Sequence, residues 1–337
     1  MRRCARRKTM RTSSPSLDKP RLLALIALPP ATEAALRQSY TLHTLVDVPS
    51  QAWHQQLNTG ALQTVRAVVT NGSTGLSAAQ MTRLPALEIV SAFGAGYENI
   101  DLAAAAQRDI VVTHAPGANA ATVADHAIGM LLALARAYGP LTEAVRQGRW
   151  QTSRAERPTL SGATLGIIGM GRIGRLIAAR AHGFAMTIGY YGRHPQDDAP
   201  GRYYSELAQL ANASDFLVIT CPGGAETLHL VDRTILRALG PGGYLVNVSR
   251  GSVLDTGGLI EALTQHEIAG AGLDVIEGEP DIPKALLNCN NLLITPHVAG
   301  RSPASQRAQC TTLLASLSQH FSRLPLEFAL ELSVGPA

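Results

Sequence analysis

The chain has 337 residues, of which 46% are hydrophobic and 16% are charged. This length lies beyond the size at which a single hydrophobic core stops growing, so two domains are expected, and the composition is too apolar for a disordered chain. The four cysteines are scattered without a CxxC pair, which argues against a disulfide-stapled secreted domain or a zinc ribbon and favours a reducing, cytoplasmic compartment without a metal site.

The net charge of +4 is concentrated at the start of the chain. Residues 1–19 carry a net charge of +6, which leaves −2 for the rest, so the body is mildly acidic and a nucleic-acid partner is not expected. The segment is rich in Arg, Ser and Thr without an apolar period, which predicts a disordered basic tail, with Met10 as an alternative start. A second interpretation is the basic region of a signal peptide, because residues 22–28 are apolar, but that run suits a buried strand better.

Short apolar runs alternate with helical patterns along the first part of the chain. This order is typical of a parallel sheet covered by helices. Helices are expected at 32–39 and 77–83, and a long helix with an apolar side is expected at 121–138, where it would bridge two domains. The expected strands lie at residues 21–28, 41–46, 67–70, 88–92 and 110–113.

A second series of the same kind follows a connection at residues 151–161. Its last amphipathic stretch, residues 303–323, is expected to return the chain to the first domain. No run approaches the ~18 apolar residues of a membrane span, so no membrane partner is expected. The expected strands lie at residues 164–168, 186–190, 216–220, 244–248, 270–274 and 292–295.

The motif GMGRIG at residues 169–174 stands between an apolar run and a helical pattern. A strand before the motif and a helix after it are the context of a dinucleotide-binding fingerprint. Gly169 would allow the tight turn, Gly171 would let the backbone approach a pyrophosphate, and Gly174 would let helix and strand pack closely. The helix N-terminus adds N–H donors and the positive end of a dipole. The alternative is a glycine-rich turn that binds nothing.

The next strand ends without the acidic residue that usually accepts hydrogen bonds from the ribose 2′-hydroxyl of NAD. Tyr191 stands at that place, and no carboxylate precedes Asp197. NADP(H) is therefore the preferred cofactor, with NAD(H) possible, because Arg193 can pair with a 2′-phosphate and His194 can assist. The other interpretation treats Arg193 as a solvated loop arginine.

Three chemically active residues follow expected strands of the second series: Arg250, Glu279 and His297. Because the carboxyl ends of parallel strands border the ligand crevice of a doubly wound sheet, they can converge despite their separation in sequence. A guanidinium can bind a carboxylate, an imidazole can give or take a proton, and a carboxylate can orient and charge that imidazole. Each residue alone is ordinary, but together beside a nucleotide fold they indicate a catalytic set.

Several segments resemble the D-2-hydroxyacid dehydrogenases in order and spacing, over roughly residues 20 to 325. The YYGR sequence at 190–193 resembles the glyoxylate/hydroxypyruvate reductase branch most closely. The other segments that carry the resemblance are GAGYENID at 94–101, GMGRIG at 169–174, VSRG at 248–251, GLDV at 272–275 and PH at 296–297.

The resemblance implies an α/β fold with two doubly wound domains and a homodimeric assembly. A Rossmann cofactor domain at 119–299 would be inserted into a flavodoxin-like substrate domain formed by 20–118 and 300–337. The implied catalytic residues are Arg250, Glu279 and His297, and the backbone N–H groups of Ala95 and Gly96 would hold the substrate carboxylate. The cofactor contacts that the resemblance implies are Arg172, Ile173, Arg193, Pro222, Val248, Asp274, Ala299 and Gly300.

The chain departs from the pattern of these relatives at two places. Asp125 stands where relatives often have Glu, which is a conservative change. Trp150 is followed by Gln151, so the second tryptophan that some hydroxypyruvate reductases place near the partner's pocket is absent, which leaves the substrate side chain open. Glu279 stands where related formate dehydrogenases use Gln, so formate is not expected as a substrate.

These features predict NADPH-dependent reduction of a 2-oxo acid to a D-2-hydroxy acid, with His297 as proton donor. The rival hypothesis is a nucleotide-sensing protein, similar to the transcriptional corepressors of this fold, that binds without turnover. The complete catalytic set argues against it. Arg301 should lie near the cleft mouth, either as a contact for a distal polar or anionic group of the substrate or as a solvated arginine before the last helix.

Overall fold

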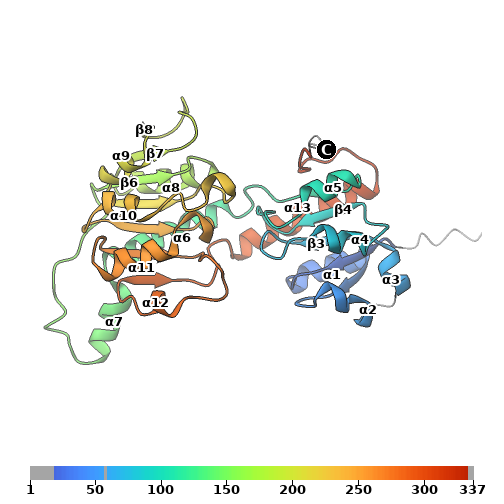
Figure 1. Ribbon diagram of the computed structural model, residues 1–337, viewed down its shortest axis with the longest axis horizontal. Coiled ribbons are helices and arrows are strands. Elements are labelled where there is room, and N and C mark those ends of the chain that lie inside the picture. Colours follow the sequence, from blue (N-terminus) through green and yellow to red (C-terminus); the bar gives the residue numbers. More distant parts are fainter. Residues whose placement is uncertain (1–18, 57–58, 333–337) are drawn as a thin grey trace, which may run out of the picture.

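The helices and strands form two lobes, each built around its own parallel sheet (Figure 1). The computed structural model describes residues 19–56 and 59–332. Apart from Lys19, the basic tail expected at residues 1–19 lies outside the described residues. Within the described ranges no single helix is long and apolar enough to cross a membrane.

The sheet of the first lobe has five strands in the order β2-β1-β3-β4-β5, and every neighbouring pair is parallel. This is the flavodoxin-like order, as the resemblance implied. Apart from the edge strand β2, its strands consist mostly of buried residues, which is the pattern of a sheet covered on both faces. The strands are β1 (Arg21–Ala24), β2 (Thr41–Thr44), β3 (Val65–Thr70), β4 (Ile89–Ala92) and β5 (Val111–Thr113).

Helices from both ends of the chain cover this sheet. Leu313 and Leu317 of the last helix lie in the same buried cluster as Leu22 of β1, so the chain returns to the first lobe as expected. The backbone N–H of Leu330 then donates to the carbonyl of Val112 at 2.8 Å, beyond the last helix. The helices are α1 (Pro30–Ser39), η1 (Ser50–Ala52), α2 (Trp53–Gln56), α3 (Thr59–Gln63), α4 (Ala78–Thr82), α5 (Leu102–Gln107) and α13 (Pro303–Phe321).

The sheet of the second lobe has seven strands in the order β12-β11-β10-β9-β6-β7-β8, again all parallel. Numbered from its own first strand, the order contains the 3-2-1-4-5-6 arrangement of the Rossmann fold with one further strand. The direction of winding reverses between β6 and β9. The strands are β6 (Thr164–Ile168), β7 (Thr187–Tyr191), β8 (Arg202–Tyr204), β9 (Phe216–Ile219), β10 (Tyr244–Asn247), β11 (Gly270–Leu273) and β12 (Leu292–Ile294).

Helices on both faces complete the second lobe, and its two buried clusters lie on opposite sides of the sheet. The apolar side of α6 packs among residues of β6, β10 and α8 in one of these clusters. The helices are α6 (Ala120–Ala135), α7 (Tyr138–Arg146), α8 (Arg172–His182), α9 (Leu207–Asn212), η2 (Ala225–Thr227), α10 (Arg233–Leu239), η3 (Gly251–Val253), α11 (Thr256–Thr264) and α12 (Lys284–Leu287).

Three elements differ from the expectation. The strand expected at 21–28 ends at Ala24, and the chain from Ile26 to Pro29 lines the cleft described below. The helix expected at 121–138 ends at Ala135, because Ala137 has a left-handed φ of 52° and a new helix, α7, begins at Tyr138. The edge strand β8 was not expected, since it has only three residues and none of them is fully buried.

Candidate active site

A cleft of about 710 Å³ is lined by residues of both lobes. The lining follows the carboxyl ends of strands in both sheets, where doubly wound folds bind ligands. The first lobe contributes the segments after β1, β3 and β4, and the second lobe contributes those after β9, β10 and β12. Of the expected site residues, those that line this cleft are Ala95, Gly96, Ile173, Pro222, Val248, Arg250, Asp274, His297, Ala299, Gly300 and Arg301.

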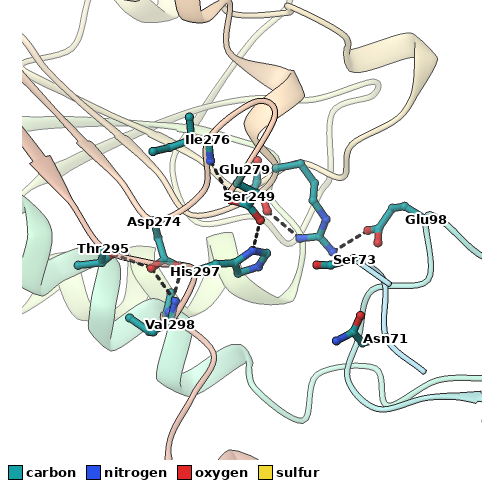
Figure 2. A network of polar contacts seen from close by, with 12 residues as sticks. Asn71, Ser73, Glu98, Ser249, Asp274, Ile276, Glu279, Thr295, His297 and Val298 are labelled. Carbon is teal, nitrogen blue, oxygen red and sulfur yellow. Dashed lines mark hydrogen bonds and ion pairs between the residues drawn. The ribbon is translucent and has the colours of Figure 1, made fainter. Parts of the chain in front are cut away.

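His297 and Glu279 form a pair at the cleft wall (Figure 2). Nδ1 of His297 is hydrogen bonded to Oε1 of Glu279, and Oε2 of Glu279 accepts from the backbone N–H of Ile276 at 3.1 Å. An ionised carboxylate only accepts hydrogen bonds, so Nδ1 carries the proton. Nε2 has no hydrogen-bond partner among the described residues and remains available to a ligand.

The carboxyl group of Glu279 is held in its ionised form. Partial burial would raise the pKa of Glu279, but the hydrogen bonds from His297 and Ile276 and the charges of His297 and Arg250 outweigh it and lower the pKa below its ordinary value. Glu279 is therefore an anion near neutral pH and accepts a hydrogen bond from the imidazole of His297.

Asp274 anchors the segment that carries His297. Its side chain is 2% exposed, and it accepts from the backbone N–H groups of Val298 and Ala299, each at 2.9 Å (Figure 2). The hydroxyl of Thr295 donates to the same carboxylate at 2.6 Å. His297 has a left-handed φ of 51°, a conformation that the surrounding contacts must hold.

Arg250 lies on the same cleft and reaches across to the first lobe. Its Nη2 donates to Oε1 of Glu98 at 2.6 Å, and its Nη1 donates to the carbonyl of Ser249 at 2.7 Å (Figure 2). A Cβ at Gly96 would lie 2.4 Å from Nη2 of Arg250, so a side chain at position 96 would clash with the guanidinium. The structure thus brings Arg250 close to the backbone that was expected to hold a carboxylate.

The ion pair between Glu98 and Arg250 was not anticipated from the sequence. Glu98 belongs to the GAGYENID segment, so an acidic residue two positions after Gly96 was the signal that could have found it. Its side chain is 35% exposed and that of Arg250 is 34% exposed, so solvent weakens the pair but does not replace it. Glu98 occupies one donor of the guanidinium that is expected to bind the substrate carboxylate.

The glycine motif has the geometry that its residue types require. Gly169 has a φ of 97°, and a Cβ there would lie 2.7 Å from the backbone nitrogen of Cys221. A Cβ at Gly174 would lie 2.3 Å from the carbonyl oxygen of Gly169, whereas one at Gly171 would meet nothing within 4 Å. Space for a ligand is therefore open at Gly171, directly before the N-terminus of α8.

A dinucleotide fits this arrangement of residues. The open backbone at Gly171 and the first turn of α8 suit a pyrophosphate, and the cleft continues to His297. Arg172 does not line the main cleft but a neighbouring cavity of about 370 Å³ that also includes Gly117. The carbonyl of Tyr191 accepts from the N–H of Gly169 at 2.9 Å, which places the end of β7 beside the motif.

Arg193 and His194 lie outside the cleft, in the loop that follows β7. Both side chains are exposed, and neither has a hydrogen bond or ion pair with any residue that the structure describes. Their position after β7 is compatible with contacts to the adenosine end of a dinucleotide, because β7 neighbours β6, the strand that leads into the glycine motif.

Arg301 lines the cleft beside Gln306 and Gln309 of α13. Its side chain is exposed, and its backbone N–H donates to the carbonyl of Val298 at 2.8 Å. Arg301 thus stands just before Ser302, which caps α13 by accepting from the N–H of Ser305.

The two departures from the family pattern lie away from the cleft lining. Asp125 on α6 accepts from Nε of Arg180 on α8 at 2.6 Å, so it joins two helices of the second lobe. Trp150 follows α7 and is 60% exposed. No group of three or more His, Cys, Asp or Glu side chains within the described ranges could hold a metal ion.

Comparison with known proteins gives a consistent assignment. Residues 128–299 match the family described as D-isomer specific 2-hydroxyacid dehydrogenase, NAD binding domain. The chain is 41% identical over 259 residues to a glyoxylate/hydroxypyruvate reductase A of Arabidopsis thaliana, a match that covers 77% of this chain and 83% of the relative. It is 32% identical over 306 residues to 2-ketogluconate reductase of Gluconobacter oxydans, covering 90% and 96% of the two chains.

A solved structure supports the same assignment. The NADPH-dependent glyoxylate/hydroxypyruvate reductase of Sinorhizobium meliloti, in complex with NADP and malonate, superposes with a TM-score of 0.84 at 36% identity. The match covers 93% of this chain and 97% of the solved chain, so both lobes take part in it.

The packing of the glycine motif leads to a stability prediction. Gly174→Ala should lower the free energy of unfolding by about 1–3 kcal/mol, because the new Cβ would press on the Gly169 carbonyl. Gly171→Ala is the matched control, since a Cβ there meets open space, and its unfolding should match the wild type. Thermal or urea unfolding measures both, and equal destabilisation by the two variants would contradict the packing argument.

Proposed function

The chain belongs to the D-isomer-specific 2-hydroxyacid dehydrogenase family, and on that basis we propose that it is an NADPH-preferring reductase of 2-oxo acids. The relatives named above are reductases of glyoxylate, hydroxypyruvate or 2-ketogluconate, so the chain is an oxidoreductase. The single observation that carries the mechanism is the His297–Glu279 pair on the same cleft as Arg250. The nucleotide-sensing alternative is not favoured, because His297 and Arg250 line one cleft and Glu279 is hydrogen bonded to His297.

Binding of the substrate carboxylate falls to Arg250 and the backbone of the first lobe. The guanidinium of Arg250 provides charge-assisted donors, and the N–H groups of Ala95 and Gly96 line the facing wall. Together these donors would fix the 2-oxo acid and polarise its carbonyl group. Residues of the glycine motif and α8 would hold the cofactor, which supplies a hydride when bound.

Proton transfer falls to His297. Its Nδ1 is engaged with Glu279, so Nε2 is the atom that would give a proton to the carbonyl oxygen of the substrate. Glu279 orients the ring and stabilises its positive charge before transfer, and Asp274 holds the backbone on which the ring stands. Water exclusion by closure of the two lobes would strengthen each of these interactions.

The preference for NADPH is supported by the loop after β7. Tyr191 replaces the usual acid, so no carboxylate stands there to repel a 2′-phosphate. Arg193 is exposed without a partner among the described residues, which leaves its guanidinium free for a phosphate. The similar solved reductase is itself described as NADPH-dependent.

We also propose that the protein is a homodimer. Helix α7 and the loop after it project from the second lobe (Figure 1). Tyr138, Val145 and Trp150 in this region are exposed by 55%, 46% and 60%. Large apolar side chains gathered on a projecting segment are typical of a protein interface.

The first functional prediction concerns the proton donor. His297→Ala should lower kcat for reduction of glyoxylate by about 10²–10⁴-fold, because general acid catalysis contributes that much. Binding of NADPH should stay close to that of the wild type. Steady-state kinetics measures kcat, and a fluorescence titration measures the binding of NADPH. Near-normal turnover at neutral pH would exclude His297 from this role.

Glu279→Gln tests the partner of the imidazole. Gln keeps the shape of the side chain but removes the negative charge beside Nδ1 of His297, so the ring loses a charge-assisted hydrogen bond and kcat for reduction should fall. The lowered pKa of Glu279 keeps the wild-type carboxyl ionised near neutral pH, so the variant differs from the wild type in charge under ordinary assay conditions. A smaller loss of kcat than in His297→Ala is expected in steady-state assays, and a wild-type kcat would remove Glu279 from the mechanism.

Cofactor preference is tested at Arg193. Arg193→Ala should weaken NADPH far more than NADH, because only NADPH loses a charge-assisted hydrogen bond of about 1.5–3 kcal/mol. Arg202→Ala, in the adjoining strand β8, is a matched control whose guanidinium lies over the ring of Tyr204. Equal loss of kcat/KM for the two cofactors would contradict the assignment.

Arg301 is tested with two substrates. If Arg301 contacts a distal anion, Arg301→Leu should lower kcat/KM for 2-oxoglutarate more than for glyoxylate, by about tenfold or more. Arg307→Leu is the control, since Arg307 lies on α13 but does not line the cleft. Equal effects on both substrates would leave Arg301 as a solvated surface charge.

A further inference from the structure

Residues 192–201 form the loop between β7 and β8. Hydrogen bonds hold this loop to the rest of the lobe on both sides of Arg193 and His194. Loops of this length with exposed side chains are ordinarily mobile. Here the side chains of Arg193 and His194 are exposed, yet the backbone on either side of them is held by hydrogen bonds from the flanking strands. These hydrogen bonds order the backbone beside two side chains that have no partner among the described residues.

Tyr190, a buried residue of β7, holds the part of the loop that follows His194. Its side chain is 2% exposed, and its hydroxyl accepts from the backbone N–H of Gln196 at 2.9 Å. The same hydroxyl donates to the carbonyl of Gln196 at 3.3 Å. A single buried phenol therefore satisfies both backbone groups of one loop residue.

Arg175 provides a second attachment from helix α8. Its Nη2 donates to Oε1 of Gln196 at 2.6 Å and to Oδ1 of Asp198 at 2.7 Å, and its Nη1 donates to the carbonyl of Asp198 at 2.9 Å. Its own backbone N–H donates to the carbonyl of Gly171, so Arg175 stands in the first turn after the glycine motif. The loop is thus tied directly to the helix whose N-terminus suits a pyrophosphate.

Arg175 also pairs with a negative charge of the same loop. The hydrogen bond and charge of Arg175 lower the pKa of Asp198, so this exposed carboxyl is an anion. Left unpaired, it would add a negative charge to the loop that carries Arg193 and His194, which disfavours an anionic ligand. Directly before Arg193 in the chain, the carbonyl of Gly192 accepts from the hydroxyl of Tyr203 at 3.3 Å.

The geometry points to Tyr190 and Arg175 as positioning residues that hold Arg193 and His194 ready for the 2′-phosphate of NADPH. This inference rests on the proposed preference for NADPH and names residues that act through the loop. Neither touches the 2′-phosphate itself. Because the loop is already ordered, binding loses less conformational entropy, and the benefit falls only on the ligand that carries the 2′-phosphate.

The experiment compares two nucleotides that differ only in that group: adenosine 2′,5′-bisphosphate and adenosine 5′-monophosphate, titrated by calorimetry into the whole protein. Tyr190→Phe keeps the ring and removes the hydroxyl, and Arg175→Met removes the three hydrogen bonds that the guanidinium donates to the loop. Each variant should weaken the bisphosphate roughly three- to tenfold, the range of about one net hydrogen bond, and leave the monophosphate within twofold.

Two control variants remove the same kinds of side-chain group, a guanidinium and a tyrosine hydroxyl, at positions that do not contact the loop. Arg180→Met removes an arginine of the same helix that is paired with Asp125 instead. Tyr244→Phe removes a hydroxyl from another strand of the same sheet that has no hydrogen bond within the described residues. Both controls should keep the wild-type ratio of the two affinities. Thermal unfolding of every variant shows whether a change in ratio follows a loss of stability.

The outcomes separate this inference from the proposed function. If the wild type binds both nucleotides equally, the NADPH preference and the positioning role fail together. If the wild type prefers the bisphosphate and Arg193→Ala abolishes that preference, but Tyr190→Phe and Arg175→Met retain it, only the positioning role is overturned. Equal weakening of both nucleotides would also overturn it, since it would mean contact with their shared part. Should Tyr190→Phe fail to fold, Arg175→Met decides.

Discussion

The buried carboxylate of Asp274 is the constraint on which the position of His297 depends. Burying an anion without partners would cost several kcal/mol, and here two backbone N–H groups and one hydroxyl remove that cost. The donors all come from the segment that holds His297, so satisfying the charge also fixes the backbone of that segment. The left-handed conformation of His297 is held in this way, and the imidazole meets Glu279 as a result.

The two lobes contribute different walls of the cleft. The second lobe holds His297, which is hydrogen bonded to Glu279, and the first lobe provides the facing wall. The ion pair of Arg250 and Glu98 joins the two walls. Because that pair is partly exposed, it joins the lobes without locking them together.

The cofactor end of the molecule shows the same division between exposed reactive groups and buried support. Arg193 and His194 are exposed, as groups that meet a soluble ligand must be. Their support comes from Tyr190 inside the core and from Arg175 on the helix after the glycine motif. A site with exposed charges can therefore be ordered before any ligand arrives, provided that hydrogen bonds from neighbouring elements hold its backbone.

The sequence by itself determined the class of fold, most of the strands, the glycine motif, the presence of Arg250 and His297 on one cleft, and the pairing of Glu279 with His297. These follow from local causes: apolar runs of strand length, glycines whose missing side chain is needed, and strand ends that a parallel sheet must bring to one edge. Glu98 as the partner of Arg250, Asp274 as the anchor of His297, and the fastening of the loop by Tyr190 and Arg175 were decided only by tertiary structure. Glu98 and Arg250 come from different lobes, Asp274 and Ala299 follow different strands, and Arg175 reaches the loop from a helix. Pairing across such separations depends on packing that no local pattern encodes.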